Sequence, residues 1–355
     1  MSRFFSSQNS KLMPYTPGEQ PLDRKFIKLN TNELPYPPSP KVVDALKNTD
    51  ADSLRLYPDP ECKKLCRTVS NFYGFEPNQV IVGNGSDEIL AFIYMAFFGR
   101  GDSVCFPDIS YGFYEVYADL FGINPVVVPL KENFALSLDD YYDKSGNVII
   151  ANPNAPTAMA ITVEEIERFL VKFPDRLLIV DEAYADFWSD SAVRLVNQYD
   201  NLIVVQTLSK SRALAGMRIG IAVGNSGLID DLNKIKYSFN PYNINRISQD
   251  LAIKAFEDVG YLRETSEKIV RTRDRCVDYF REIGCTVTDS ATNFIFVKSP
   301  KIGGKKLYLS LKEKGILVRH FDKPRLTDYV RVTVGTDEEM DKLITCYETI
   351  IMENV

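Results

Sequence analysis

Lys210 is the residue whose type and setting suggest chemistry most directly. It follows an apolar stretch, residues 202–205, and the hydroxyl residues Ser209 and Ser211 flank it. An amine that is partly removed from water near the cationic Arg218 suits a nucleophile that forms Schiff bases with carbonyl compounds. The segment therefore predicts covalent chemistry at a lysine.

A carboxylate ends a second apolar stretch. Asp181 comes directly after residues 177–180, and Tyr184 follows three residues later. A carboxylate at the mouth of a buried strand is unfavourable unless a cation or hydrogen-bond donors compensate it. The pattern predicts either a carboxylate that pairs with a cation or a cap on a following helix.

A glycine-containing turn at residues 83–88 precedes a strongly apolar helical stretch. Glycines allow a tight turn, and a helix N-terminus offers unpaired N–H groups to an anion such as phosphate. The turn has Glu88 where a dinucleotide-binding fingerprint needs its third glycine, and it lacks the Gly-Lys-Ser/Thr of a P-loop. It predicts an anion site or a plain helix cap, and it disfavours an NAD-binding domain.

Composition excludes several other classes. The chain has one histidine, His320, so metal sites that need two or more imidazoles are excluded and we expect no metal. Its 42 basic and 48 acidic residues argue against a nucleic-acid partner. Its longest apolar run, residues 89–98, is too short to cross a membrane. Six cysteines without a C-x-x-C pair and a polar N-terminus predict a cytoplasmic protein with reduced thiols.

Seven short apolar runs alternate with helical patterns and must position these residues. The runs are apolar at almost every position, which is typical of strands buried on both faces of a parallel sheet. This pattern predicts a doubly wound α/β fold with ligands at the carboxyl ends of its strands. The expected strands are residues 80–82, 103–106, 126–128, 148–151, 177–180, 202–206 and 219–223.

Three regions are expected along the chain. A proline-rich N-terminal arm occupies residues 1–45, a large domain residues 46–255, and a smaller α+β domain residues 256–355. Two capping boxes, Thr162 to Glu165 and Thr336 to Glu339, predict helix starts. In the smaller domain we expect helices at 262–283, 305–314 and after 336, and strands at 293–298, 316–319 and 329–334.

The segment Thr207 to Gly216, with Asp181 and Arg218 at their spacing, resembles the cofactor-lysine motif of class II pyridoxal-phosphate-dependent aminotransferases. Nearly the full chain resembles the histidinol-phosphate aminotransferase family within that class. This resemblance implies the fold type I of pyridoxal-phosphate enzymes, with a mainly parallel seven-stranded sheet, and a homodimer with shared active sites. The other matching segments are residues 14–18, 29–33, 56–59, 85–88, 152–157, 181–184 and 331–335, with Tyr111 and Arg319.

The resemblance also implies roles for individual residues. Lys210 would hold pyridoxal phosphate and move the substrate proton, Asp181 would pair with the pyridine nitrogen, and Tyr184 would bond the phenolic oxygen of the ring. Tyr111 would stack on the ring, unless it is a core aromatic. The implied phosphate ligands are Gly85, Ser86, Asp87, Thr207, Ser209 and Arg218, with Tyr57 reaching across from a partner subunit unless it is an exposed loop residue.

One departure from the family pattern concerns the phenolic oxygen. Ala155 stands where the family usually has the asparagine that bonds this oxygen, and Ala158 replaces a glycine. Two alternatives follow: either Asn154 makes the contact, or Tyr184 makes it alone.

Substrate recognition is expected from Arg331, Arg319 and the arm residue Tyr15. Arg331 alternates with valines in its strand, so its side chain leaves the hydrophobic face and suits a carboxylate or phosphate. By resemblance, these residues bind the phosphate of L-histidinol phosphate and the carboxylates of glutamate in a transamination that yields imidazole-acetol phosphate. The alternatives are an aromatic aminotransferase, a threonine-phosphate decarboxylase, or a catalytically silent ligand-binding regulator. His320 is expected at the rim of the site.

Overall fold

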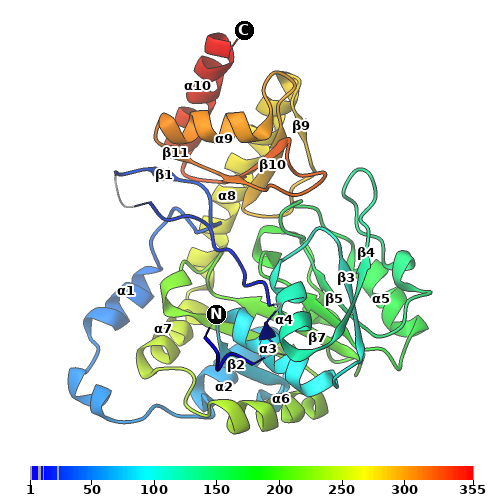
Figure 1. Ribbon diagram of the computed structural model, residues 1–355. Coiled ribbons are helices and arrows are strands. Elements are labelled where there is room, and N and C mark those ends of the chain that lie inside the picture. The colour runs from blue at the N-terminus through cyan, green and yellow to red at the C-terminus, as the bar shows by residue number, and fades with distance from the viewer. Residues whose placement is uncertain (1, 7–8, 11, 22–23, 355) are drawn as a thin grey trace.

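The computed structural model describes residues 2–6, 9–10, 12–21 and 24–354 (Figure 1). In the view of Figure 1 a large sheet with helices around it forms the lower body. A smaller body with α9 (Gly304–Glu313) and α10 (Asp337–Asn354) lies above it, and α8 (Val259–Glu282) rises between the two. No helix in the described ranges is long and apolar enough to span a membrane.

The large sheet has seven strands in the order β2-β8-β7-β6-β5-β3-β4. Only β8 runs against its neighbours, pairing antiparallel with both β2 and β7. The expected mainly parallel, doubly wound α/β fold is therefore confirmed. Its strands are β2 (Val80–Asn84), β3 (Ser103–Pro107), β4 (Asn124–Val128), β5 (Asn147–Ala151), β6 (Leu178–Asp181), β7 (Leu202–Thr207) and β8 (Ile219–Gly224).

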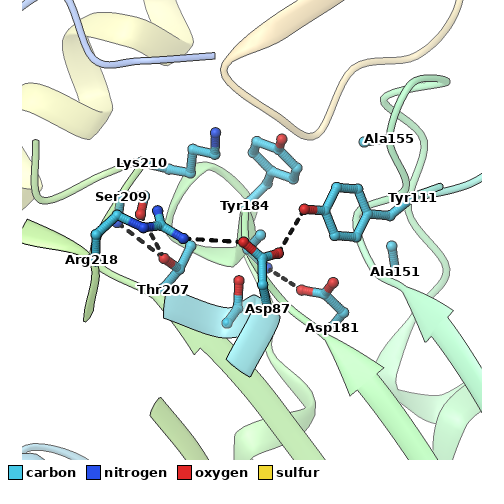
Figure 2. A pocket seen from close by; sticks show the side chains of 12 residues that line it. Asp87, Tyr111, Ala151, Ala155, Asp181, Tyr184, Thr207, Ser209, Lys210 and Arg218 are labelled. Carbon is cyan, nitrogen blue, oxygen red and sulfur yellow. Dashed lines mark hydrogen bonds and ion pairs between the residues drawn. The ribbon is translucent and has the colours of Figure 1, made fainter. Parts of the chain in front are cut away.

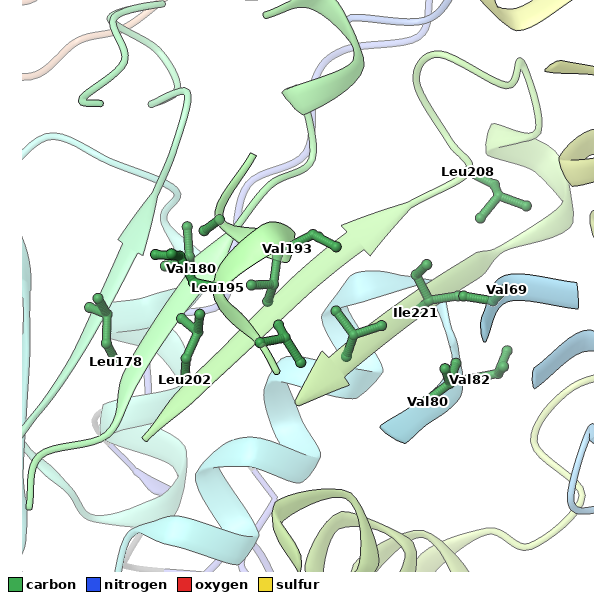
Figure 3. Close-up of a cluster of buried hydrophobic side chains, with 14 of the residues drawn as sticks. Val69, Val80, Val82, Leu178, Val180, Val193, Leu195, Leu202, Leu208 and Ile221 are labelled. Atoms are coloured by element: carbon green, nitrogen blue, oxygen red, sulfur yellow. The ribbon is translucent and has the colours of Figure 1, made fainter. Parts of the chain in front are cut away.

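Helices cover both faces of this sheet. Successive strand residues point to opposite faces, so Val80 and Val82 join one buried cluster while Ile81 joins the other. Figure 3 shows part of the first cluster, in which Val80, Val82 and Ile221 lie near Val69. This double burial explains why the strands are almost continuously apolar. One face packs on α2 (Lys63–Tyr73), α5 (Val163–Lys172) and α7 (Arg246–Glu257), and the other on α3 (Gly85–Phe97), α4 (Phe113–Phe121) and α6 (Ser226–Phe239).

The smaller body contains an antiparallel sheet in the order β12-β13-β10-β9. The single strand expected at 316–319 is divided in two, because β11 pairs with the arm strand β1 whereas β12 pairs with β13. Both predicted capping boxes form, and Gly284, which follows α8, has a left-handed φ of 86°. The strands are β1 (Ile27–Lys28), β9 (Thr286–Val287), β10 (Phe294–Lys298), β11 (Ile316–Leu317), β12 (Arg319–His320) and β13 (Tyr329–Thr333).

The N-terminal arm connects the two bodies. Its strand β1 pairs in parallel with β11, and Leu29 joins the hydrophobic core of the smaller body. The chain then passes above the edge of the large sheet, where the carbonyl of Thr31 accepts a hydrogen bond from Lys210 Nζ at 3.1 Å. The arm thus pairs with the smaller body and also contacts the edge of the large sheet. α1 (Pro40–Lys47) follows and packs beside α7.

Candidate active site

A cavity of about 130 Å³ opens at the carboxyl edge of the large sheet (Figure 2). The ends of β2, β5, β6 and β7 meet there, and β8 begins there because it runs in the opposite direction. This reversal brings Arg218, which directly precedes β8, to the same edge as Lys210 and Asp181. The lining residues are Ser86, Asp87, Tyr111, Ala151, Ala155, Asp181, Ala183, Tyr184, Thr207, Ser209, Lys210 and Arg218.

Two glycines let Arg218 approach the first turn of α3. A Cβ at Gly85, whose φ is 80°, would collide with the guanidinium of Arg218. A Cβ at Gly220 would likewise collide with the backbone amide of Ser86. Arg218 itself has a left-handed φ of 55°, a conformation that is uncommon for a residue with a side chain. The close approach places a guanidinium beside a helix N-terminus, an arrangement that suits an anion such as phosphate.

Hydroxyl groups complete this anion-binding end of the cavity. Ser209 donates its backbone N–H to Thr207 Oγ1 at 3.2 Å, and the two side-chain oxygens are 3.0 Å apart. Arg218 contacts Asp87 Oδ2 at 3.1 Å, and Tyr111 donates to the other oxygen of Asp87 at 2.7 Å. Both members of the Arg218–Asp87 pair remain partly exposed, so the guanidinium keeps donors available for an additional anion.

Asp181 is buried at the base of the cavity. Its carboxylate accepts hydrogen bonds from the hydroxyl of Tyr114 at 3.0 Å and from the backbone N–H of Ala183 at 3.3 Å. Burial raises the pKa of Asp181 to about 6, against the lowering effect of the Tyr114 hydrogen bond. Within the described ranges no cationic side chain forms an ion pair with it. A buried carboxylate without a cation fits a ligand that brings a protonated nitrogen.

Lys210 and Tyr184 lie across the cavity from Asp181 (Figure 2). The Lys210 Nζ atom is 5.8 Å from the centre of the Tyr184 ring. The hydroxyl of Tyr184 accepts a hydrogen bond from Asn32 Nδ2 at 2.8 Å, and its ring packs edge-on against Phe294. The cavity therefore combines an amine, a carboxylate without a cation and an anion-binding end, which is a donor set that fits pyridoxal phosphate.

Arg331 and Arg319 stand beside each other on the neighbouring sheet, where their Cα atoms are cross-strand partners. Arg331 donates to the carbonyl of Asn30 at 2.9 Å, its buried Nε has no partner, and burial lowers its pKa. Arg319 donates to the carbonyls of Thr16 and Pro17 in the arm. No carboxylate in the described ranges forms an ion pair with either arginine, which suits an anionic substrate.

Tyr15 comes from the arm and stacks on Phe113, with ring centres 4.6 Å apart. Its pKa is raised by burial, while the charges of Arg331 and Arg319 act to lower it. The three residues that we expect to bind substrate thus lie close enough to interact. They do not line the 130 Å³ cavity itself.

Four further residues singled out in the sequence also lie outside the cavity lining. Gly85 contacts Arg218 from behind, as described above. Tyr57 is 78% exposed and stacks on Tyr242, with ring centres 4.6 Å apart, so its ring is accessible from outside this chain. His320 is also away from the cavity and contacts the carbonyl of Thr327 at 2.9 Å.

Asn154 is the fourth, and its side-chain amide makes hydrogen bonds elsewhere. Its Nδ2 donates to Ile109 O and Thr157 Oγ1, and its Oδ1 accepts from Ser110 at 2.7 Å. Ala155, its neighbour, lines the cavity instead. The arrangement favours the alternative in which Tyr184 makes the contact that the missing asparagine would share.

Several residues of the site were not expected from the sequence. Ala151 and Ala183 line the cavity as small residues, and Tyr114 bonds to Asp181 from a helix where it resembles any core aromatic. Asn32 bonds to Tyr184 across 152 positions of sequence. The segment 29–33 of the arm was the one available signal for it. In the described ranges no cluster of histidine, cysteine and carboxylate residues could hold a metal ion.

Comparison with known proteins agrees with this geometry. Residues 24–346 match the family described as aminotransferase class I and II. Histidinol-phosphate aminotransferase from Brachyspira hyodysenteriae is 49% identical over 352 residues, which cover 99% of both chains. The enzyme of the same name from Marinomonas sp. is 49% identical over 354 residues, covering 99% of this chain and all of the relative.

Solved structures are similar over the same length. Histidinol-phosphate aminotransferase from Sinorhizobium meliloti, in complex with pyridoxal-5′-phosphate, matches with a TM-score of 0.89 at 25% identity. The match covers 100% of this chain and 99% of that one. The enzyme of the same name from Clostridium acetobutylicum matches with a TM-score of 0.85 at 25% identity, over 92% and 99% of the two chains.

Proposed function

The chain belongs to the class I and II aminotransferase family, and we propose that it is a pyridoxal-phosphate-dependent histidinol-phosphate aminotransferase. The proposed reaction converts L-histidinol phosphate and 2-oxoglutarate to imidazole-acetol phosphate and L-glutamate, a step of histidine biosynthesis. The observation that carries the proposal is the convergence of Lys210, the cation-free Asp181 and the Arg218 anion site on one cavity. The names of the full-length relatives support this substrate over the aromatic and decarboxylase alternatives.

Pyridoxal phosphate, when bound, supplies an electron sink for the charge that remains when a substrate C–H bond breaks. The anion-binding end would hold its phosphate through the Ser86 amide, the hydroxyls of Thr207 and Ser209, and Arg218. The buried carboxylate of Asp181 would keep the pyridine nitrogen protonated, because each charge favours the charged form of the other. The pyridinium would thus offset the burial that raises the pKa of Asp181. Tyr111 would bound one side of the ring.

Lys210 performs the proton transfer in this proposal. Its amine lies in the cavity and contacts only the carbonyl of Thr31 at hydrogen-bond distance among the described residues. A neutral lysine amine can take a proton from the substrate carbon and return it at a neighbouring atom of the cofactor. The arm segment and the aromatic side chains around the cavity would exclude water from this step.

Arg331 and Arg319 would bind the anionic end of each substrate, with Tyr15 completing the site. Both substrates of the proposed reaction carry anionic groups, a phosphate in one and two carboxylates in the other. A pair of adjacent guanidinium groups can bind either group through paired N–H donors. One site can then serve both halves of the reaction.

We further infer a homodimer with shared sites, in the cytoplasm. Tyr57 and its neighbours Leu54 and Leu56 are more than half exposed, which supports a surface that a second copy covers. Tyr57 would then reach the anion-binding end of the partner's cavity. The six cysteines are all unpaired, which supports a reducing compartment.

The proposed activity is tested with purified protein and separate substrates. We expect glutamate to form from L-histidinol phosphate and 2-oxoglutarate, a visible absorption band from bound cofactor, and borohydride fixation of the cofactor on Lys210. Lys210→Ala should abolish glutamate formation and borohydride fixation, and should shift the absorption band because the cofactor is no longer linked to a lysine. Glutamate formation from phenylalanine or tyrosine but not from histidinol phosphate would contradict the substrate and leave the reaction class intact.

Sharing of sites between subunits is tested by mixing two variants. Chains with Lys210→Ala and chains with Tyr57→Phe are each impaired, but a mixed dimer would contain one site with both side chains intact. Activity above the sum of the separate variants is expected after subunit exchange. Activity equal to that sum, or a monomer in light scattering, would contradict the shared site.

A further inference from the structure

The hydroxyl of Tyr184 ends a run of hydrogen bonds that starts at the backbone N–H of Asn32 and passes through the Thr333 hydroxyl and the Asn32 side chain. The N–H of Asn32 donates to Thr333 Oγ1 at 3.0 Å. The Thr333 hydroxyl in turn donates to Asn32 Oδ1, with the two oxygens 3.1 Å apart. This contact assigns the oxygen of the Asn32 amide, and therefore also its nitrogen.

The nitrogen of the Asn32 amide faces Tyr184. Asn32 Nδ2 is 2.8 Å from the Tyr184 oxygen, and an amide nitrogen can only donate. The tyrosine oxygen is therefore the acceptor in this bond, and its own hydrogen must point elsewhere. Asn32 and Thr333 are almost completely buried, so water does not compete for these contacts.

The cavity is the remaining direction for this hydrogen. Tyr184 lines the cavity, and no other hydrogen-bond partner for its hydroxyl lies among the described residues. The lining residues contributed by the ends of β5 and β6 include Ala151, Ala155 and Ala183, none of which has a polar side chain. Tyr184 is thus the one hydroxyl that this part of the described lining offers to a ligand.

We propose that Asn32, oriented by Thr333, is a positioning residue that directs the Tyr184 hydroxyl hydrogen into the cavity, and that this chain depends on it because Ala155 provides no second donor. Asn32 is held in a left-handed conformation with a φ of 57°. That strain is consistent with a backbone shaped to bring its side chain between β13 and Tyr184. The inference rests on the proposed function, since it assumes that Tyr184 faces the phenolic oxygen of the bound cofactor.

The effect can be measured without turnover. A hydrogen bond to the phenolic oxygen stabilises its anionic form and weakens its hold on the proton shared with the nitrogen that links the cofactor to Lys210. Loss of the bond should raise the pH midpoint of the visible absorption change of the resting enzyme. For Tyr184→Phe we expect a rise of about one to two pH units, the size of a hydrogen bond to a charged group.

Asn32→Gly is the decisive variant. Glycine adopts a positive φ without strain, so the substitution removes the amide and leaves the backbone conformation accessible. We expect the midpoint to rise by about half a pH unit or more, because the Tyr184 hydroxyl is then free to turn away. Thr333→Val, which removes the group that orients the Asn32 amide, should move the midpoint in the same direction and serves if Asn32→Gly does not fold.

Asn30→Ala is the matched control. Asn30 is an equally buried asparagine two positions earlier, but its amide donates to the carbonyl of Glu19 in the arm at 2.8 Å. It should leave the midpoint unchanged even if it lowers stability. In a double variant with Tyr184→Phe, Asn32→Gly should add nothing further, because its effect passes through the missing hydroxyl.

The outcomes separate this inference from the proposed function. If Tyr184→Phe raises the midpoint and Asn32→Gly does not, or if the two shifts add fully, the positioning role of Asn32 is overturned and the role of Tyr184 stands. If Tyr184→Phe leaves the midpoint unchanged, the contact of Tyr184 with the cofactor is overturned as well. Equal shifts for Asn32→Gly and Asn30→Ala would indicate a general loss of packing and would also overturn the proposal.

Discussion

Asp181 and Glu182 are adjacent carboxylates at the end of β6, and they face opposite sides of the chain. Both are almost completely buried, and burial raises the pKa of Asp181 to about 6 and that of Glu182 to about 7. Glu182 accepts hydrogen bonds from Ser191 Oγ, the Ala192 amide and Gln206, all at 2.6–3.0 Å. Asp181 accepts two, and one of these is long.

The difference lies in what remains unsatisfied. Three donors from the protein surround Glu182, which makes it a structural group that ties β6 and β7 to the segment at 191–192. Asp181 lines a cavity and has acceptor capacity left for a cation. Burial and a raised pKa therefore do not by themselves identify a functional carboxylate. Free hydrogen-bond acceptor capacity beside a cavity does.

Asp181→Asn should produce the largest effect on activity. Removing the charge leaves the cofactor nitrogen without its counter-ion, which costs about 3–5 kcal/mol for a buried pair and lowers kcat/KM about 10²- to 5 × 10³-fold. The free energy of unfolding of the apoprotein should stay the same or rise, because a buried charge is lost. Steady-state kinetics and urea unfolding of the same sample measure both quantities. A stability loss with unchanged kinetics would place Asp181 in the same class as Glu182.

Arg331, which is half-buried, and Arg273, which is buried, extend the comparison to cations. Arg273 donates to the carbonyls of Phe187 and Thr292 and pairs with Asp274. Among the described residues, Arg331 has no carboxylate partner, and its buried Nε has no hydrogen-bond partner. Arg331→Gln should raise KM for both substrates about 10- to 100-fold through loss of a charge-assisted bond.

Arg273→Gln is the counterpart and should lower stability with little change in KM. Initial-rate measurements at varied histidinol phosphate and 2-oxoglutarate test both variants. If KM rose equally in the two variants, the unpaired Nε of Arg331 would not be a sign of a substrate-binding residue.

Glu182→Gln should have a moderate effect on stability alone. The amide nitrogen of the new glutamine would face a donor, whereas the carboxylate oxygen it replaces accepted a hydrogen bond there. Leaving a buried donor without an acceptor lowers the free energy of unfolding by about 1–3 kcal/mol. Urea unfolding should show this loss. We expect kcat and KM to change less than about twofold, as for substitutions that lie away from the active site. A large fall in kcat at unchanged stability would contradict the structural role of Glu182.

The smallest expected effect is a pH dependence of stability that separates the two carboxylates. A carboxyl group with a raised folded-state pKa binds its proton more tightly when folded, so stability falls as pH rises between the unfolded and folded pKa values. For Glu182 this window runs from 4.5 to about 7, and for Asp181 from 3.8 to about 6.

Cofactor binding should remove the contribution of Asp181, because a cation beside it lowers its pKa, and should leave that of Glu182 in place. Unfolding of the apoprotein and of the cofactor-bound protein between pH 4 and pH 8 tests this. The same slope in both forms would argue against a cationic partner for Asp181.

Much of the fold was predictable because its signals are local. The apolar runs predicted all seven strands of the large sheet to within two residues at each end, and helices start at the Thr162 and Thr336 capping boxes as expected. The strand expected at 316–319 shows the limit. Its apolar residues were identified, but its division between β1 and β13 depends on pairing with segments far away in the sequence.

The sequence by itself determined the types of group at the site: the lysine after β7, the carboxylate ending β6 and the glycine turn before α3 are each encoded within a few residues. Tertiary structure decided which of these groups keep unsatisfied partners. The reversed direction of β8 carries Arg218 to the cavity, and the arm brings Asn32 to Tyr184 from 152 positions away. The physical reason is that hydrogen-bond satisfaction depends on every neighbour in space, whereas a motif specifies only its neighbours along the chain.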